Sequence, residues 1–229
     1  MLDTKSLSYK KLLHAITLTF VPGRLYGIIG ANGSGKTTLL KTMSGIWAPT
    51  SGHVFWQNAD LLKMERRTIS QTLSLVPQNP QVHFDFSVAE MVAMGRYAHY
   101  SVQPQDIEEA LSAVNALHLK QRPISQLSSG ERQRVYIARA LITKAPVILL
   151  DEPTASLDVR HQEEIWLLLQ RLSQQGKVVI MASHDLNAVT RYCTDMIAMQ
   201  MGLCVAAEPV SFLTPEFLRG LFFDEKSQL

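Results

Sequence analysis

The chain has 229 residues and a formal net charge of +2, and 46% of its residues are apolar, 18% charged and 7% aromatic. This composition supports a buried core and excludes a chain that is disordered throughout. Lys and Arg are spread along the chain without a long block of like charge, so nothing in the charge pattern predicts nucleic acid as a partner.

The N-terminal segment MLDTKSLSYKKLL lacks the apolar run and the small-residue cleavage site of a signal peptide. This absence indicates the cytosol as the default compartment. Two cysteines, Cys193 and Cys204, are too few for a disulfide framework and are not spaced like zinc ligands. We expect both to be structural thiols in the core.

Short apolar runs rich in Val, Ile or Leu predict four strands, at residues 24–30, 72–78, 146–152 and 177–183. Helical patterns alternate with them at about 36–44, 87–97, 105–118, 130–143, 157–175 and 185–192. This alternation is typical of an α/β domain, in which helices cover a parallel sheet. Each run ends in polar residues, and ligands of such sheets bind beyond the carboxyl ends of the strands.

Helix boundaries and an insertion are also indicated. Gly45 and Gly176 follow two of the helical patterns where a C-terminal cap belongs, and the stretch from Ser87 to Glu90 has the pattern of a capping box. No strand pattern occurs between Phe86 and about Ser125. Because repeats and flexible linkers are absent as well, we expect one domain, residues 1–229, with a helical subdomain of about 86–140.

The tract from Met196 to Ala207 carries no charged residue. It is shorter than the roughly 20 residues that a membrane-spanning helix needs, so it predicts a strand in the core. No segment of the sequence is expected to cross a bilayer.

The strongest local motif is Gly30-Ala-Asn-Gly-Ser-Gly-Lys-Thr37, which matches the phosphate-loop pattern between a predicted strand and a predicted helix. Glycines at 33 and 35 let consecutive N–H groups face phosphate oxygens, Lys36 reaches the β- and γ-phosphates, and the Thr37 hydroxyl ligates Mg²⁺. An ordinary glycine-rich turn is the alternative, although it rarely reproduces the whole pattern. The predicted nucleotide-binding residues are Gly30, Asn32, Gly33, Ser34, Gly35, Lys36, Thr37 and Thr38.

Two carboxylates, Asp151 and Glu152, end the apolar run VILLDE. Burying them beside that run is costly unless a cation or a proton compensates. Asp151 is suited to hold Mg²⁺, directly or through water, and Glu152 to take a proton from an attacking water. A pair facing solvent is the alternative, but the phosphate loop favours the nucleotide interpretation.

The stretch LSSGE, residues 127–131, lies about twenty residues before Asp151 and is similar to the signature LSGGQ of ABC transporter ATPases. With the other motifs, nearly the whole chain resembles that family. The resemblance implies an α/β P-loop ATPase with a mostly parallel core sheet, an antiparallel β portion at the N-terminus and a helical subdomain. Ser129 replaces the first signature glycine and Glu131 the glutamine. Alone, the stretch also reads as a helix beginning at Ser128.

The resemblance implies a head-to-tail homodimer, because in the family the signature of one subunit covers the γ-phosphate of ATP bound to the other. Ser128, Ser129 and Gly130 would therefore contact the partner's nucleotide at a helix N-terminus. The Cβ of Ser129 lies where backbone approaches phosphate, which predicts a less tight closure.

Four further positions match the family. Tyr9 corresponds to the aromatic residue that stacks on adenine, and Gln78 to the glutamine that reaches Mg²⁺ and the attacking water. Asp158 in ASLD corresponds to the aspartate that organises the site across the dimer, and His184 to the histidine that contacts the γ-phosphate. A core tyrosine, a helix N-cap and a loop histidine are the respective alternatives for Tyr9, Asp158 and His184. The implied catalytic residues are Glu152, His184 and Gln78, and the implied Mg²⁺ ligands are Thr37, Gln78 and Asp151.

The family also implies a membrane partner. A permease would dock near residues 82–100, whose Phe84, Phe86, Met91 and Met94 have core packing as their alternative role. The protein would then lie peripherally on the cytoplasmic face of the membrane, with an extracytoplasmic substrate-binding protein as an indirect partner. Because the sequence ends at Leu229, soon after the predicted core, we expect no added regulatory domain.

The stretch MVAMGRYAHY resembles importer ATPases for iron-siderophore complexes, haem and cobalamin at Gly95, Arg96 and His99, with Ala98 where a proline is usual. We therefore expect an ATPase that powers uptake of a metal chelate. Import of zinc, manganese or molybdate is the alternative within the family. A soluble ABC ATPase of DNA repair or translation, and a P-loop kinase or switch protein, are the alternatives outside transport.

Overall fold

The structure is a computed structural model that describes residues 1–78, 85–98, 101–155 and 157–223. A six-stranded sheet forms its centre, in the order β10-β9-β3-β8-β7-β6. The strands of this sheet are β3 (Leu25–Ile29), β6 (Leu73–Val76), β7 (Val147–Asp151), β8 (Val178–Ala182), β9 (Asp195–Gln200) and β10 (Leu203–Pro209). All neighbours pair in parallel except β9 and β10. The mostly parallel core sheet and its four predicted strands are thus confirmed.

A second sheet is antiparallel and comes from the N-terminal part of the chain. Its order is β2-β1-β4-β5, with β1 (Leu2–Tyr9), β2 (Leu13–Phe20), β4 (Ser51–Trp56) and β5 (Ala59–Asp60). The expected antiparallel portion is therefore present, and the α/β fold class is confirmed.

Helices cover the faces of the six-stranded sheet or form the insertion at its β6 end. They are α1 (Lys36–Met43), α2 (Arg66–Thr72), α3 (Val88–Ala93), α4 (Pro104–Ala113), α5 (Ser129–Leu141), α6 (Val159–Gln174), α7 (Leu186–Tyr192) and α8 (Pro215–Phe223). Short 3-10 turns are η1 (Leu61–Lys63), η2 (Met94–Arg96), η3 (Leu117–Leu119), η4 (Ile124–Gln126) and η5 (Val210–Phe212). Of these helices, α2 and α8 are not predicted by the sequence pattern. Among the described residues no helix is both long and apolar enough to span a membrane.

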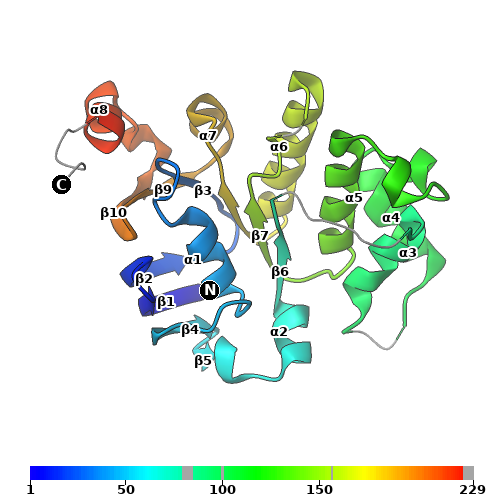
Figure 1. Cartoon of the computed structure of the whole chain (residues 1–229), viewed down its shortest axis with the longest axis horizontal. Coiled ribbons are helices and arrows are strands. Elements are labelled where there is room, and N and C mark those ends of the chain that lie inside the picture. Colours follow the sequence, from blue (N-terminus) through cyan, green and yellow to red (C-terminus); the bar gives the residue numbers. More distant parts are fainter. Residues whose placement is uncertain (79–84, 99–100, 156, 224–229) are drawn as a thin grey trace.

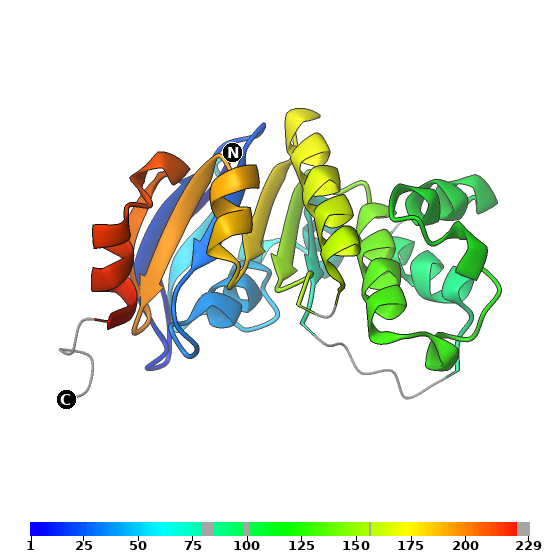
Figure 2. The same cartoon turned by 90° about the horizontal axis from the view of Figure 1, so that it is seen from above.

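The core has two layers, one on each face of the six-stranded sheet. In β7, Val147 and Leu149 pack with α1 and the antiparallel sheet, whereas Ile148 and Leu150 pack with α5, α6 and α7. In Figure 2, α6 (yellow) and α1 (blue) accordingly lie on opposite sides of the sheet. Burial on both faces explains why these strands are apolar without interruption.

The predicted helical insertion lies at the β6 end of the sheet, where α3, α4 and α5 pack together (Figure 1). The capping box at α3 is confirmed: the Ser87 side chain accepts from the backbone of Glu90, whose carboxylate accepts from the backbone of Ser87. The helix predicted to reach residue 118 ends at Ala113, because Asn115 adopts a left-handed φ of 53°. A helical subdomain of about 86–140 within one domain stays a prediction.

The uncharged tract from Met196 to Ala207 is not one core strand, as the sequence suggests. It is divided between β9 and β10, which pair antiparallel with Gln200 opposite Leu203. Met201 and Gly202 form the turn, with φ values of 50° and 79°. A two-residue turn with both φ values positive matches the twist of a hairpin, so the chain reverses there instead of continuing.

Gly95, one of the positions that match the chelate importers, has a packing role. A Cβ added at Gly95 would lie 2.1 Å from the carbonyl oxygen of Arg139 in α5. Its neighbour Arg96 binds Asp106 of α4 through Nη1 at 2.7 Å. Both residues therefore hold η2 against the other helices of the insertion, while the third position, His99, lies outside the described residues.

We expect Gly95→Ala to lower the free energy of unfolding by about 1–3 kcal/mol, because the added methyl group must push η2 away from α5. Urea unfolding followed by circular dichroism measures this change. Gly220→Ala in α8 is the matched control, since a Cβ there meets no atom within 4 Å and alanine favours a helix. An unchanged midpoint for Gly95→Ala would show that the two elements do not pack as closely as described.

Candidate active site

The phosphate loop connects β3 to α1 at the carboxyl edge of the sheet. At Gly30, φ is 147°, and a Cβ would lie 2.2 Å from the carbonyl oxygen of Met199 in β9. Only glycine lets the loop pass this close to the neighbouring strand. The predicted turn is present as well, with positive φ at Gly33 and Gly35. A cleft of about 550 Å³ opens beside the loop, lined by Leu12, Asn32, Gly33, Gly35, Lys36, Thr37, Thr38, Gln78, Glu152 and His184.

Lys36 begins α1, and its ammonium group bends back over the loop. Its Nζ donates to the carbonyl oxygens of Gly30 at 2.9 Å and Ala31 at 3.1 Å. Burial lowers the pKa of Lys36, while the nearby carboxylates of Glu152 and Asp151 act in the opposite direction. Among the described residues Lys36 forms no salt bridge within 4 Å, so its charge is available to an anion in the cleft.

Thr37 and Asp151 form the next pair. The Thr37 hydroxyl donates to Asp151 Oδ1 at 3.0 Å, and Asp151 is only 2% exposed. Burial raises the pKa of Asp151, whereas the hydrogen bond from Thr37 lowers it. A buried carboxylate next to a hydroxyl is an oxygen donor set that suits a hard divalent cation.

These two oxygen donors fit Mg²⁺, which proteins usually hold through one or two carboxylates, water and substrate phosphates. The described part of the chain contains no cluster of three or more His, Cys, Asp or Glu residues placed to bind a metal.

Gln78, Glu152 and His184 meet at the edge of the cleft. Gln78 follows β6, Glu152 follows β7 and His184 follows β8, so all three come from the carboxyl ends of neighbouring strands. Gln78 Nε2 donates to Glu152 Oε2 at 2.6 Å, and His184 Nε2 contacts Glu152 Oε1. Both oxygens of the Glu152 carboxylate are thus engaged.

The backbone at Glu152 adopts an uncommon conformation, with a left-handed φ of 49°. Its N–H donates to the carbonyl oxygen of Ala182 in β8 at 3.1 Å. Residues held in this region cost free energy and cluster at functional sites. The conformation and the two side-chain contacts aim the carboxylate at the cleft.

Ser34 of the phosphate loop and Thr38 of α1 have little exposed surface. Ser34 and Thr38 are buried, and the Ser34 hydroxyl has no hydrogen-bond partner among the described residues. A buried hydroxyl without a partner is uncommon. Ser34 does not line the cleft, and its hydroxyl lies 2.7 Å from where a Cβ at Gly30 would stand, so it faces the backbone of the loop.

The signature segment does not line this cleft. Ser128 is the N-cap of α5 and Ser129 and Gly130 form its first turn, so the helix start that the sequence also suggests is present. The residues near the phosphate loop therefore form only part of the predicted site.

Asp158 and Tyr9 also lie outside the lining of the cleft. Asp158 caps α6 by accepting from the backbone N–H of His161 at 3.0 Å, and it pairs with the His161 ring at 2.8 Å. Tyr9 stacks on Trp47, with ring centroids 5.2 Å apart. Trp47 extends the aromatic surface at Tyr9, and sequence reasoning missed it.

Leu12, which lines the cleft, is the other residue that sequence reasoning missed. It lies in the turn between β1 and β2, where its N–H donates to the carbonyl oxygen of Tyr9 at 2.9 Å, and its side chain is exposed. An exposed leucine in a turn gives no signal in the sequence. Only the packing of that turn beside Gly35 places it at the site.

The predicted docking segment is described in part. Residues 82–84 and 99–100, including Phe84, lie outside the described residues. Met91 is buried and Phe86 packs against the core, so core packing holds for both, whereas Met94 is exposed.

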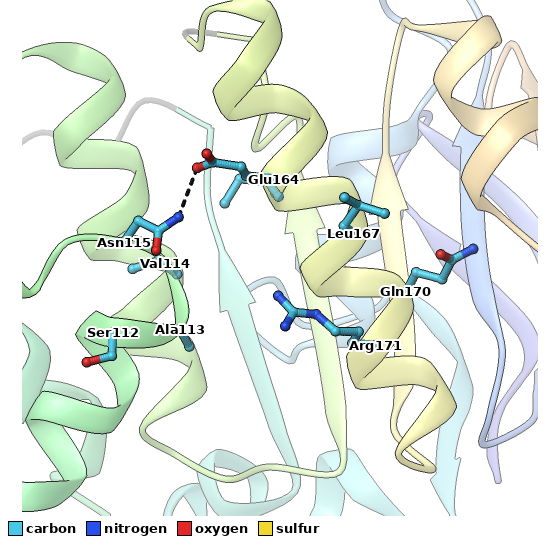
Figure 3. A pocket seen from close by; sticks show the side chains of 9 residues that line it. Ser112, Ala113, Val114, Asn115, Glu164, Leu167, Gln170 and Arg171 are labelled. Carbon is cyan, nitrogen blue, oxygen red and sulfur yellow. Dashed lines mark hydrogen bonds between the residues drawn. The ribbon is translucent and has the colours of Figure 1, made fainter.

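A second cleft, of about 500 Å³, lies between the end of α4 and α6 (Figure 3). Asn115 Nδ2 donates to Glu164 Oε2 across it at 3.1 Å, and the Arg171 side chain extends toward the α4 side. None of the predicted site residues lines this cleft. The nucleotide chemistry therefore belongs to the cleft at the phosphate loop.

Comparisons with known proteins agree with this geometry. The family model described as ABC transporter matches residues 13–155. The chain is 37% identical over 225 residues to the hemin import ATP-binding protein of Bordetella pertussis, covering 92% of this chain and 86% of that protein. It is 37% identical over 219 residues to the cobalamin import ATP-binding protein of Halobacterium salinarum, covering 93% of this chain but only 55% of that protein. The chain thus spans about half the length of the cobalamin relative.

Solved structures of ABC proteins are also similar to this chain. A transporter described as of metal-chelate type, in an inward-facing conformation, matches with a TM-score of 0.81 and 30% identity, over 96% of this chain and 87% of its own. A dimeric ATP-binding cassette in a post-hydrolysis state with ADP and Pi matches with a TM-score of 0.82 and 25% identity, over 92% of this chain and 99% of its own.

Proposed function

The chain belongs to the ABC transporter family of ATP-binding proteins, and from this membership we propose that it hydrolyses ATP to power import through a membrane permease. The observation that carries the proposal is the contact of Gln78 and His184 with Glu152 beside the phosphate loop. These groups supply a proton acceptor and its two positioning partners next to a site for a triphosphate.

The phosphates of ATP bind to the loop and to Lys36. The backbone N–H groups of the loop and the N-terminus of α1 attract the phosphates, and the Lys36 ammonium is already held over them by Gly30 and Ala31. Thr37, Asp151 and Gln78 are the groups that would hold Mg²⁺. When bound, the ion would offset negative charge on the β- and γ-phosphates.

Glu152 is the proposed general base for hydrolysis. Its carboxylate accepts a proton from the attacking water, while Gln78 keeps it oriented. His184 contacts the same carboxylate and its side chain is 46% exposed, so it can turn to the γ-phosphate once nucleotide is bound.

A second copy of the chain would complete the site. Ser128, Ser129 and Gly130 lie outside the cleft at the start of α5, where the N–H groups of the first turn, and the Ser128 hydroxyl once it leaves Glu131, suit an anion on a partner. We propose a head-to-tail homodimer in which this segment covers the partner's γ-phosphate, Asp158 organises the interface and Tyr9 stacks on adenine. The dimeric state of a related cassette supports dimerisation of this chain.

A metal chelate, such as an iron-siderophore complex, haem or cobalamin, is the proposed cargo. Relatives named for hemin and cobalamin import and a structure of metal-chelate type support this class. The chain would then be one ATPase domain held peripherally at the cytoplasmic face of the membrane by its permease, with an extracytoplasmic substrate-binding protein as an indirect partner.

Affinity purification of the tagged chain from detergent-solubilised native membranes tests the transport proposal. We expect mass spectrometry to identify a polytopic permease that is absent from an untagged control. Soluble or nucleic-acid-associated partners alone, with the dimer intact, would favour a soluble ABC ATPase instead.

Uptake into proteoliposomes that contain the purified complex then tests the cargo. We expect ATP-dependent uptake of a ferric siderophore, haem or cobalamin. Uptake of free zinc, manganese or molybdate in their place would contradict the chelate proposal and keep the import proposal.

A further inference from the structure

A carboxylate occupies the N-terminus of α5, where the signature segment begins. Glu131 Oε2 accepts from the backbone N–H of Ser128 at 2.9 Å and from the Ser128 hydroxyl at 2.9 Å. In return, the N–H of Glu131 donates to Ser128 Oγ at 3.2 Å. The hydroxyl expected to meet a phosphate is therefore bound to a neighbouring anion.

This carboxylate is charged at neutral pH. The N–H of Ser128 lowers the pKa of Glu131 most, and the Ser128 hydroxyl and the positive charges of Arg122 and Arg134 lower it further. Under the proposed function, the same helix end receives the γ-phosphate of a second copy. Two anions at one helix N-terminus repel each other, so the charge of Glu131 needs an offset when the dimer closes.

Arg122 forms an ion pair with the other carboxylate oxygen of Glu131. Its Nη1 is 3.5 Å from Glu131 Oε1, and its Nη2 donates to the carbonyl oxygen of Gln126 at 3.0 Å. The Arg122 side chain is 45% exposed and that of Glu131 23%. The carbonyl of Arg122 accepts from the N–H of Val88, which ties the backbone of this residue to the start of α3.

Arg134, the other cation near Glu131, is committed elsewhere. Its Nη1 donates to the carbonyl oxygen of Asn115, and the residue is buried. Arg122 is half exposed and directed at the outer oxygen of the carboxylate. It is thus the cation placed to follow Glu131 when Ser128 changes its partner.

We propose that Arg122 is a positioning residue for nucleotide-dependent dimer closure: it offsets the charge of Glu131 and holds that side chain, so that the Ser128 hydroxyl is released to donate to the partner's γ-phosphate. This inference rests on the proposed function. It also explains how residue 131 can be a glutamate. The family signature has an uncharged glutamine there, and Arg122 balances the negative charge that glutamate adds.

A purely structural role for Arg122 makes a different prediction. If Arg122 only held the turn at Gln126, its loss would cause the same defect whether residue 131 were charged or not. If it offsets charge, glutamine at 131 removes the need for it, since a glutamine side-chain oxygen still accepts from Ser128.

The test compares wild type, Arg122→Ala, Arg122→Lys, Glu131→Gln and the double variant Arg122→Ala with Glu131→Gln. We expect Arg122→Ala to raise the ATP concentration for half-maximal turnover by about fivefold, the upper end for a partly exposed ion pair. Nucleotide binding to the isolated protomer stays unchanged, because the phosphate loop is intact. Arg122→Lys behaves like wild type, and the double variant returns to within about twofold of Glu131→Gln alone.

The outcomes separate the two proposals. The inference is overturned if Arg122→Ala needs the same ATP concentration for half-maximal turnover as wild type, or if the double variant is as defective as Arg122→Ala. In either case ATP turnover by the wild-type chain still upholds the proposed function. A wild-type chain that neither hydrolyses ATP nor dimerises with it overturns the proposed function, and this inference with it. If Arg122→Ala does not fold, Arg122→Gln with the same partner change at 131 gives the same comparison.

Discussion

Replacing Glu152 with glutamine is expected to leave ATP binding intact, remove most turnover and hold two copies of the chain together. Glutamine has nearly the same shape, so Gln78 and His184 keep a partner, but an amide does not accept a proton from water. General-base catalysis contributes about a hundredfold to ten-thousandfold in rate, and kcat should fall by that factor. Because the γ-phosphate is not lost, the contacts that close the dimer persist.

Phosphate release measures the turnover of Glu152→Gln, and size-exclusion chromatography with and without ATP measures its dimerisation. Glu109→Gln in α4 makes the same chemical change at an exposed position away from the cleft, and it should match wild type in both measurements. Wild-type turnover in Glu152→Gln would show that Glu152 is not the base.

Lys36→Ala is expected to weaken nucleotide affinity by at least about tenfold. A hydrogen bond to a charged group contributes about 1.5–3 kcal/mol, and the variant loses the one ammonium group that the described residues place over the phosphate loop. Lys36 is 6% exposed, so its charge acts in a poorly solvated environment where attraction to phosphate is strong.

Equilibrium titration with a fluorescent ATP analogue measures this loss. Lys63→Ala removes an exposed lysine that pairs with Asp60, far from the loop in the chain, and its affinity should equal that of wild type. Circular dichroism establishes that Lys36→Ala is folded. Equal affinities for Lys36→Ala and wild type would contradict the assignment of Lys36 to phosphate binding.

Lys36→Ala and Glu152→Gln affect different steps, nucleotide binding and hydrolysis. Lys36→Ala weakens nucleotide binding, so turnover and dimerisation should fall together at an ATP concentration that only just saturates wild type, whereas Glu152→Gln removes only the chemical step. If Glu152→Gln dimerises with ATP and Lys36→Ala does not, bound nucleotide drives the closure of the dimer. A ligand shifts such an equilibrium only if it binds the closed state more tightly than the open one.

Much of the fold is readable from the sequence because its cause is local. The uninterrupted apolar run of β7 follows from burial on both faces, and the capping box at Ser87 follows from spacing within one helical turn. The phosphate loop is also local, since the glycines, Lys36 and Thr37 that define it lie within eight residues. Such patterns depend on neighbours along the chain, so they survive without knowledge of the fold.

The tertiary structure alone decided which residues meet. Gln78 and Glu152 are 74 positions apart and touch only because β6 and β7 pair in parallel and end at the same edge. The stacking of Trp47 on Tyr9 likewise joins residues that are distant along the chain. The order of strands in the sheet cannot be derived from composition or motif spacing, because it depends on which distant strands pair. The sequence therefore determined the parts of the site, and the packing of the sheet determined how they act on one another.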